Sequence, residues 1–285
     1  MINAVLRIEA PHNLFGLTII PIKKASIGVS ELKKILILYF SGVGATKKIA
    51  KSMFTGLSQD CETDIFSIEN KYTPDMNDYD ALIIGVPVYH GAPPKIVMRY
   101  FEKIPQLAKE TPAFIYSTRG LASLNTNRIL SQKLYRKNII TVIDREYRAP
   151  ASDGTIIAPF IKRFFEFEKD IEKKIDRDCA DFLILLNNVE VQGYIPRFRL
   201  GSIVNAPNKL AGQLITLKIH LHKDKCIRCG QCTEQCPYSV LLTGNDGYPF
   251  FNSNNCENCY RCIHHCPNMA LSLSKRRALK RILRY

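Results

Sequence analysis

The chain of 285 residues has 46% hydrophobic residues, 23% charged residues and a formal charge of +14, which predicts globular domains with a real apolar core. No stretch approaches the roughly 18 to 20 uncharged apolar residues that a membrane span needs, and the apolar run near the N-terminus is broken by Pro21 and does not resemble a signal peptide. We therefore expect a cytoplasmic protein with no integral membrane segment. In that compartment clustered cysteines are metal ligands or redox groups rather than disulfides.

Residues 1–33 show no clear period and form an extension of uncertain order, and a different pattern begins at residue 34. Apolar runs predict strands at 35–40, 63–68, 81–89, 112–117 and 139–144. Amphipathic helices are expected at 46–57, 94–104 and 124–137, and the pattern over 157–186 predicts a long closing helix. This alternation indicates an α/β domain over residues 34–186, built on a doubly wound parallel sheet of about five strands.

Eight of the ten cysteines occur in two runs of the same pattern. The first run is "CIRCGQCTEQCP", residues 226–237, and the second is "CENCYRCIHHCP", residues 256–267. In each run two residues separate the first three cysteines, three residues precede the fourth, and a proline follows. We expect these runs to form a module over residues 218–274, after a linker at 187–217 that follows neither period.

The pattern resembles the bacterial two-cluster ferredoxins, in which the proline turns the fourth cysteine of a run toward the other cluster. It predicts two 4Fe–4S clusters, one held by Cys226, Cys229, Cys232 and Cys266 and the other by Cys256, Cys259, Cys262 and Cys236. Zinc is the alternative, but zinc ribbons pair two C-x-x-C knuckles and have no use for a third cysteine at the same spacing. Four basic residues inside the runs are expected to face solvent, with tuning of a potential or docking of a partner as the alternative: Arg228, Arg261, His264 and His265.

A glycine-rich turn, "YFSGVGATKKIA", joins the first predicted strand to the first helix. Backbone N–H groups and the positive end of a helix can hold a phosphate at such a turn. The turn matches neither the P-loop nor the dinucleotide motif G-x-G-x-x-G. It resembles the phosphate loop of flavodoxins, T/S-x-T-G-x-T, through Ser41, Gly44 and Thr46, whereas Val43 replaces a hydroxyl expected to face the phosphate and Ala45 replaces a common Asn.

The resemblance to flavodoxins implies a five-stranded parallel sheet of order 2-1-3-4-5, with FMN bound at the carboxyl ends of the strands. Three loops would contribute to this site, and Tyr89 would flank the ring because the chain has no Trp. The expected FMN-binding residues are Ser41, Gly42, Val43, Gly44, Ala45, Thr46, Pro87, Val88, Tyr89, His90, Gly91, Ser117, Thr118, Arg119 and Gly120.

The order of the two parts resembles a family of anaerobes in which a flavodoxin-like domain precedes a two-cluster ferredoxin domain. That resemblance implies an electron-transfer protein that relays electrons between the clusters and FMN, with protein redox partners and no catalytic residue. A flavin-dependent reductase of a small molecule, fed by the clusters, is the alternative. No nucleic-acid motif accompanies the basic tail at residues 275–285, so we expect no nucleic-acid partner. Cys61 and Cys179 are expected to be packing residues.

Overall fold

The computed structural model describes residues 18–21, 33–70, 72–157, 160–187, 192–201, 219–252 and 255–273. Its largest element is a five-stranded parallel sheet of order β3-β2-β4-β5-β6. These strands are β2 (Lys34–Tyr39), β3 (Glu62–Ser67), β4 (Ala81–Pro87), β5 (Thr111–Arg119) and β6 (Ile139–Arg148). Counted along the chain, this is the order 2-1-3-4-5, so the predicted doubly wound fold is confirmed.

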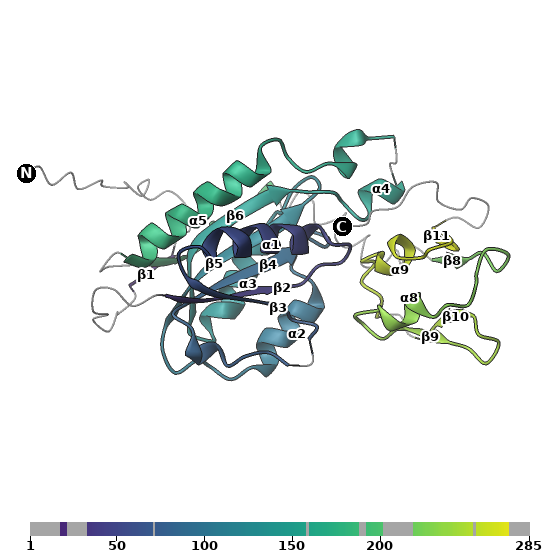
Figure 1. Cartoon of the computed structure of the whole chain (residues 1–285), viewed down its shortest axis with the longest axis horizontal. Coiled ribbons are helices and arrows are strands. Elements are labelled where there is room, and N and C mark those ends of the chain that lie inside the picture. The colour runs from purple at the N-terminus through teal and green to yellow at the C-terminus, as the bar shows by residue number, and fades with distance from the viewer. Residues whose placement is uncertain are drawn as a thin grey trace, which may run out of the picture.

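Helices cover both faces of the sheet (Figure 1). On one face lie α1 (Ala45–Leu57) and α5 (Ile171–Asn187), and on the other lie α2 (Lys95–Lys103) and α3 (Thr126–Tyr135). In β2, Ile35 and Ile37 pack toward α1, whereas Leu36 and Leu38 pack toward α2 and α3. Successive side chains of a strand point to opposite faces, so a strand covered on both sides needs an uninterrupted apolar sequence.

The predicted closing helix over 157–186 is wrong in its first half. The short helix α4 (Gly154–Ile157) ends where the segment begins, and the segment itself contains the 3-10 turn η2 (Lys162–Phe165) and then α5, which begins at Ile171. Asp170 has a φ of 54°, a left-handed conformation that interrupts a helix. Phe164, which has helical spacing in the sequence, packs against Val43 and Ala151 at the end of the sheet. The first half of the segment therefore closes the end of the sheet, and only the second half covers its face.

Two short strands lie in the ranges predicted as extension and linker. β1 (Thr18–Pro21) and β7 (Gln192–Ile195) pair antiparallel. Tyr194 donates from its hydroxyl to the Asp144 carboxylate of β6 at 2.7 Å, and a Cβ on Gly193 would lie 2.0 Å from the side chain of Ile140. The pair therefore packs against the β6 edge of the main sheet. Residues 1–17 and the basic tail at 275–285 lie outside the described residues.

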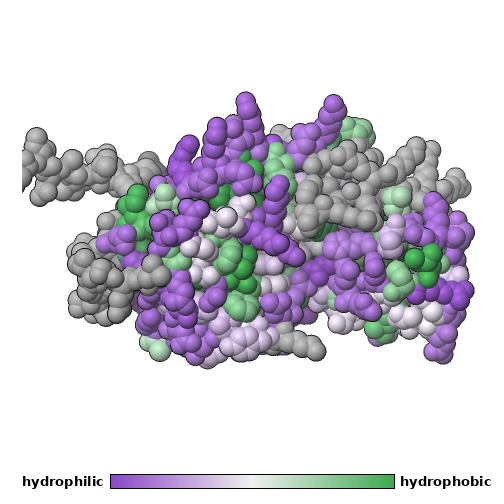
Figure 2. All heavy atoms as spheres, in the orientation of Figure 1, coloured by the Kyte–Doolittle hydropathy of each residue, from purple (hydrophilic) through white to green (hydrophobic). Residues whose placement is uncertain are grey.

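The cysteine module, described over 219–252 and 255–273, consists of short elements beside the end of the sheet where α1 begins (Figure 1). They are β8 (His220–Leu221), α8 (Gln231–Glu234), β9 (Leu241–Thr243), β10 (Pro249–Phe251), α9 (Arg261–His264) and β11 (Leu271–Ser272). β8 pairs with β11 and β9 with β10, both antiparallel. Polar side chains dominate the surface over α1 and much of the module (Figure 2). Among the described residues, no helix combines the length and apolar character needed to cross a bilayer.

Candidate functional site

The loop between β2 and α1 presents backbone donors at the end of the sheet. Gly44 precedes α1 with a φ of 103°, a conformation that glycine adopts at little cost, and its N–H donates to Ser41 Oγ at 3.1 Å. In the described part of the chain, the N–H groups of Gly42 and Val43 donate to no protein acceptor. The first N–H groups of α1 lack intrahelical partners as well. Together with the helix dipole, these donors can hold an anion such as a phosphate.

Two adjoining pockets open at this end of the sheet. Residues 41–44, between β2 and α1, form the turn that resembles the phosphate loop of flavodoxins, and we refer to it by that name. This loop, the start of α1 and the carboxyl ends of β4 and β5 with their following loops line the first pocket with Ser41, Gly42, Val43, Ala45, Thr46, Pro87, Val88, Tyr89, Thr118, Arg119 and Gly120. The second pocket, of about 230 Å³, is lined by residues that include Val88, His90, Gly91, Gly120, Leu121 and Leu124. Three of the predicted loops therefore meet at one place, as expected for strand ends in an open α/β sheet.

A fourth loop contributes to both pockets and was not predicted. Ala151 and Asp153, which follow β6, line both of them, and Phe164 lines the second. The position of this loop after the last strand was a usable signal, because the carboxyl ends of parallel strands share one edge of the sheet. The contribution of Phe164 could not be predicted, because its spacing in the sequence assigned it to the expected closing helix.

Some predicted residues are not placed as expected. Gly44 and Ser117 line neither pocket: Ser117 is buried inside β5, and Gly44 is the N-cap of α1, within the loop where it was predicted. The side chain of Val43 is turned toward Phe164 rather than toward a phosphate. Only the N–H group of Val43 is therefore left to meet an anion.

Tyr89 abuts the phosphate loop instead of the larger pocket. A Cβ on Gly42 would lie 2.1 Å from the Tyr89 hydroxyl oxygen and 3.7 Å from the carbonyl oxygen of Cys259. The hydroxyl of Tyr89 is buried and has no hydrogen-bond partner among the described residues. Burial raises the pKa of this phenol well above its usual range. Tyr89 thus stands at the junction between the phosphate loop and the second cysteine run.

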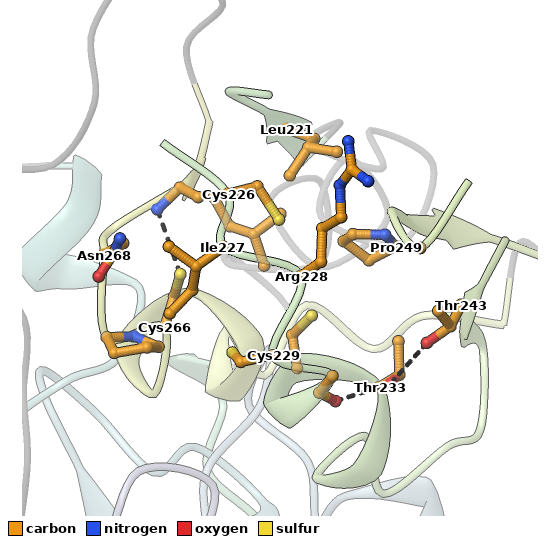
Figure 3. A pocket seen from close by; sticks show the side chains of 16 residues that line it. Leu221, Cys226, Ile227, Arg228, Cys229, Thr233, Thr243, Pro249, Cys266 and Asn268 are labelled. Carbon is orange, nitrogen blue, oxygen red and sulfur yellow. Dashed lines mark hydrogen bonds between the residues drawn. The ribbon is translucent and has the colours of Figure 1, made fainter. Parts of the chain in front are cut away.

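The first cysteine set surrounds a single pocket of the module (Figure 3). Cys226, Cys229, Cys232 and Cys266 all line this pocket. Burial, followed by the neighbouring Cys266 thiol, raises the pKa of the Cys232 thiol to about 11. The structure therefore brings the fourth cysteine of the second run to the three leading cysteines of the first.

In the second set the thiols are close enough to affect one another, whereas no group of three or more described Cys, His, Asp or Glu side chains is arranged to hold a metal ion. Burial raises the pKa of the Cys262 thiol well above its usual range, and the thiols of Cys259, Cys256 and Cys236, together with Cys232 of the first set, raise it further. Burial likewise raises the pKa of the Cys259 thiol to about 12. Thiols crowded in a poorly solvated place stay protonated unless a cation is beside them, and a metal centre supplies that charge.

Arg261, in the second run, is buried rather than solvent-facing as predicted. Its Nε donates to the Gly42 carbonyl at 2.9 Å and its Nη2 to the Ser41 carbonyl at 2.7 Å. Its Nη1 and Nη2 also form a bidentate pair with Glu69 at 2.6 and 2.7 Å. The second run is therefore fixed to the backbone of the phosphate loop.

Further contacts attach the second run to the first domain. Glu257 accepts a hydrogen bond from the Lys95 N–H at the start of α2, at 2.9 Å. His264 was also expected to face solvent, but it is fully buried and donates from Nε2 to the Ser152 carbonyl at 2.9 Å. Burial lowers the pKa of His264, which favours the neutral ring. Ile156 packs against the hydrophobic residues of the module.

The two runs differ in what surrounds them. Cys229 and Arg228 of the first run are exposed, and Ile227 is 60% exposed. Cys259 of the second run is buried beside the phosphate loop. The first run therefore contains an exposed cysteine, whereas the second run lies against the loop between β2 and α1.

Comparison with known families divides the chain in the same way. Residues 36–150 match the family model of the flavodoxin domain, and residues 218–267 match that of the 4Fe-4S dicluster domain. An uncharacterized ferredoxin of Methanocaldococcus jannaschii is 32% identical over 60 residues, which are 20% of this chain and 78% of that protein.

Two other comparisons are more limited. One subunit of the Na(+)-translocating ferredoxin:NAD(+) oxidoreductase complex of Acetobacterium woodii is 31% identical over 48 residues, which are 17% of this chain. The chain spans only 14% of the length of that relative. The solved structure of a flavodoxin from the domain Archaea is 13% identical and covers 54% of this chain and 99% of its own, with a TM-score of 0.40.

Proposed function

The chain is a fusion of a flavodoxin domain with a ferredoxin domain of the 4Fe-4S dicluster type, and on this premise we propose that it is an electron-transfer protein that connects protein redox partners to a flavin. Cubane clusters carry one electron at a time, whereas a flavin takes two and can release them singly. Their combination in one chain makes an internal relay possible.

The cysteine residues of the module fit two clusters. In the assignment that the spacing predicts, each set has four thiols, three from one run and the fourth from the other. The four thiols of the first set line one pocket, and thiolate sulfur is the ligand that iron–sulfur clusters require. We assign Cys226, Cys229, Cys232 and Cys266 to one cluster, and Cys256, Cys259, Cys262 and Cys236 to the other. The Ala270 N–H, which donates to Cys266 Sγ at 3.2 Å, would lower the electron density on that sulfur and raise the potential of the first cluster.

The paired pockets of the first domain fit FMN. The free N–H groups of Gly42 and Val43 would hold the phosphate, and the pocket of about 230 Å³ between the loops after β4, β5 and β6 would hold the ring. Thr46 Oγ1 and Thr118 Oγ1 lie 2.8 Å apart and join the first turn of α1 to the carboxyl end of β5. This contact would keep the two parts of the site in register.

The observation that carries the proposal is the attachment of the second cysteine run to the phosphate loop. Arg261, Glu257 and His264 bind three loops or helix starts at the end of the sheet. The second cluster would therefore lie beside the flavin site, without a flexible search by the smaller domain. The exposed first run would receive electrons from a protein donor.

The test is anaerobic purification with iron, sulfide and flavin analysis, followed by stopped-flow reduction with a reduced ferredoxin-type protein as donor. We expect about eight irons, as two cubane clusters contain, and one FMN per chain. Cys229→Ser and Cys259→Ser each interrupt one cluster, so both should abolish reduction of the bound flavin by the protein donor. Cys61→Ala, which changes a buried cysteine outside both runs, should not.

A small chemical reductant that reaches the flavin directly provides the control, because it should reduce the flavin in every variant. Near-stoichiometric zinc in place of iron would refute the cluster assignment. Absence of flavin from the purified protein, even after incubation with FMN, would leave only a ferredoxin function.

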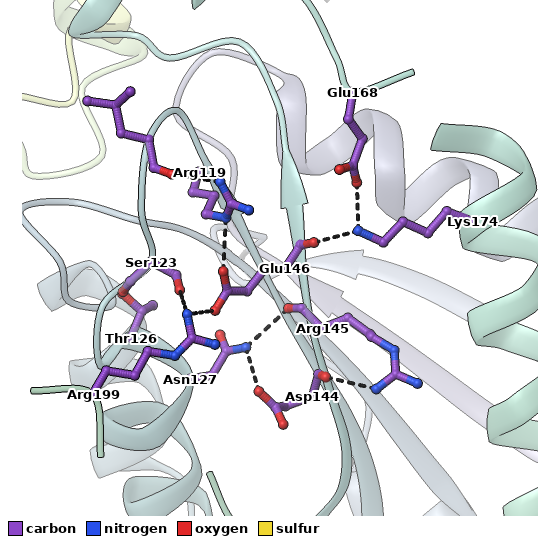
Figure 4. A network of polar contacts seen from close by, with 11 residues as sticks. Arg119, Ser123, Thr126, Asn127, Asp144, Arg145, Glu146, Glu168, Lys174 and Arg199 are labelled. Atoms are coloured by element: carbon purple, nitrogen blue, oxygen red, sulfur yellow. Dashed lines mark hydrogen bonds and ion pairs between the residues drawn. The ribbon is translucent and has the colours of Figure 1, made fainter. Parts of the chain in front are cut away.

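One observation favours a second candidate, a flavin-dependent reductase of a small molecule. A pocket of about 280 Å³ shares Leu124 with the ring pocket and is lined by Asn127, Arg128, Glu146 and Arg199. Glu146 pairs with both Arg119 and Arg199, at 2.9 and 2.6 Å (Figure 4). The Oδ1 of Asn127 is buried without a partner among the described residues, so it could accept a hydrogen bond from a ligand.

This candidate predicts that a small molecule reoxidises the reduced protein in repeated turnover. A panel of small carboxylates tests it, because guanidinium groups bind carboxylates well. Turnover that is lost in Arg128→Gln would favour the reductase. If no member of the panel reoxidises the flavin while an oxidised acceptor protein does, the electron-transfer role stands. The relative from Acetobacterium woodii belongs to a redox complex, which supports protein partners, and we propose a cytoplasmic location for the exchange.

A further inference from the structure

The contact between Arg261 and the phosphate loop has a consequence for flavin binding. We propose that Arg261 is a positioning residue through which the docked ferredoxin domain orients the phosphate loop, so that docking and flavin affinity are coupled. The inference rests on the proposed flavin site and adds a link between the two domains that neither domain would have alone.

The guanidinium of Arg261 is completely satisfied in the docked arrangement. Nε donates to Gly42 O, Nη1 donates to Glu69 and to Gln235 O at 3.1 Å, and Nη2 donates to Ser41 O and to Glu69. All five N–H groups of an arginine are therefore used. A buried charge requires pairing and full hydrogen bonding, and Glu69 and the three carbonyls provide both. Such a site allows little displacement, so it holds Ser41 and Gly42 in place.

The bonded carbonyls determine where the neighbouring N–H groups point. The carbonyl of Ser41 shares its peptide group with the N–H of Gly42, and the carbonyl of Gly42 shares its peptide group with the N–H of Val43. In a trans peptide the C=O and N–H bonds point in opposite directions. Arg261 therefore holds the carbonyls on the ferredoxin side and leaves the two N–H groups directed away from it. A cation on the carbonyl also polarises the peptide and strengthens its N–H as a donor.

The first cysteine run has a glutamine at the position that Arg261 occupies in the second run. Arg261 stands two positions after Cys259 and begins α9, and Gln231 stands two positions after Cys229 and begins α8. A glutamine at this position is therefore compatible with a cysteine run of this shape. Arg261→Gln gives the second run the residue of the first and removes the charge and most of the donors from the contact.

The test compares FMN binding to the full-length, cluster-loaded, flavin-depleted protein, measured by quenching of FMN fluorescence. We expect Arg261→Gln to raise the Kd for FMN by about 5-fold to 150-fold, the usual range of coupling between two sites. Hydrogen exchange of the Gly44 amide, which donates to Ser41 Oγ in the same loop, should become faster as the loop loses its fixed position. The iron and sulfide content and the electron paramagnetic resonance spectrum of the reduced clusters should stay the same.

Arg228→Gln is the matched control, because Arg228 is an exposed arginine of the first run that donates to the Tyr248 hydroxyl at 3.0 Å. It should leave the Kd for FMN and the exchange rates unchanged. Glu69→Gln leaves the buried guanidinium of Arg261 without its paired charge. It should therefore raise the Kd for FMN, as Arg261→Gln does.

The outcomes separate the coupling from the flavin site itself. If Arg261→Gln binds FMN as tightly as the wild type with intact clusters, the coupling is overturned and the flavin site stands. If the wild type binds no FMN, the proposed flavin site is overturned and the coupling falls with it. If Arg261→Gln also loses its clusters, Arg261→Lys decides. Lysine keeps the charge without the bidentate geometry, so wild-type FMN affinity in that variant would overturn the proposal, and weaker binding with intact clusters would support it.

Discussion

The flavodoxin domain buries two apolar clusters, one on each face of its sheet, whereas the described part of the ferredoxin domain has a much smaller one, in which Tyr260, Ile263 and Leu271 are buried. The helices α8 and α9 have four residues each, and the strands β8 and β11 have two. A domain of this size and composition buries too little apolar surface to be stable by packing alone. We therefore expect metal ligation and docking to stabilise the ferredoxin domain, whereas the flavodoxin domain should be stable without them.

Removal of iron tests this difference with the largest expected effect. Anaerobic chelation should unfold the ferredoxin domain, because the energy of metal binding is part of its folding energy. Hydrogen exchange should then show complete loss of protection over residues 219–273, while β2, β4 and β5 keep theirs. A ferredoxin domain that stays protected without iron would show that the two domains do not differ in this respect.

A core substitution should have the converse effect. Phe114 is fully buried in β5 and contacts Tyr116 and Phe182 edge to face. Phe114→Ala should lower the free energy of unfolding of the flavodoxin domain by about 3–5 kcal/mol, without changing the iron content per folded chain. Urea denaturation followed by far-ultraviolet circular dichroism measures the change. Phe160→Ala removes a ring that is 81% exposed and should have almost no effect.

Gly42→Ala tests the contact between the two domains. The added methyl group would lie 2.1 Å from the Tyr89 hydroxyl oxygen, so the loop or the docked domain must shift. We expect weaker docking by about 1–3 kcal/mol, as for an extra methylene in a packed interior. Native-state hydrogen exchange of residues 256–272 reports the opening of this contact.

Tyr89→Phe supplies the control for Gly42→Ala. The unpartnered hydroxyl contributes no hydrogen bond, so its removal alone should be nearly neutral. Without the hydroxyl, the nearest atom of this side chain to the new methyl group is Cζ, at 3.4 Å. The double variant Gly42→Ala with Tyr89→Phe should therefore dock almost as tightly as the wild type. A double variant as weak as Gly42→Ala would mean that the methyl group clashes elsewhere.

The smallest effect is expected for Lys95→Ala. The Lys95 side chain is 61% exposed and its Nζ lies 3.9 Å from Glu257, so the ion pair contributes at most about 1 kcal/mol. The main partner of Glu257 at this point is the Lys95 backbone N–H, which the substitution keeps. Docking measured by hydrogen exchange should be almost unchanged, whereas Glu257→Ala should weaken it clearly. If Lys95→Ala weakened docking as much as Glu257→Ala, the backbone N–H of Lys95 would not be the main partner of Glu257.

The fold could be predicted from local patterns to a large extent. The uninterrupted apolar runs of β2 and β4 are what a strand covered on both faces requires, and the alternation with helices indicated the parallel order. The closing segment could not be predicted in the same way. Phe164 has the spacing of a helical stripe, but its packing partners are Val43 and Ala151, which are distant in the sequence.

The cysteine spacing by itself determined the chemistry proposed for the module, because the reach of short loops limits which thiols can share a metal centre. The glycine-rich turn likewise indicated where the proposed anion site lies. Only the tertiary structure decided which cysteine run meets the sheet, and it showed that Arg261 and His264 are buried at that contact. Arg261 and Gly42 are 219 positions apart. A contact of this kind depends on the relative orientation of two domains, which no periodicity or local spacing encodes.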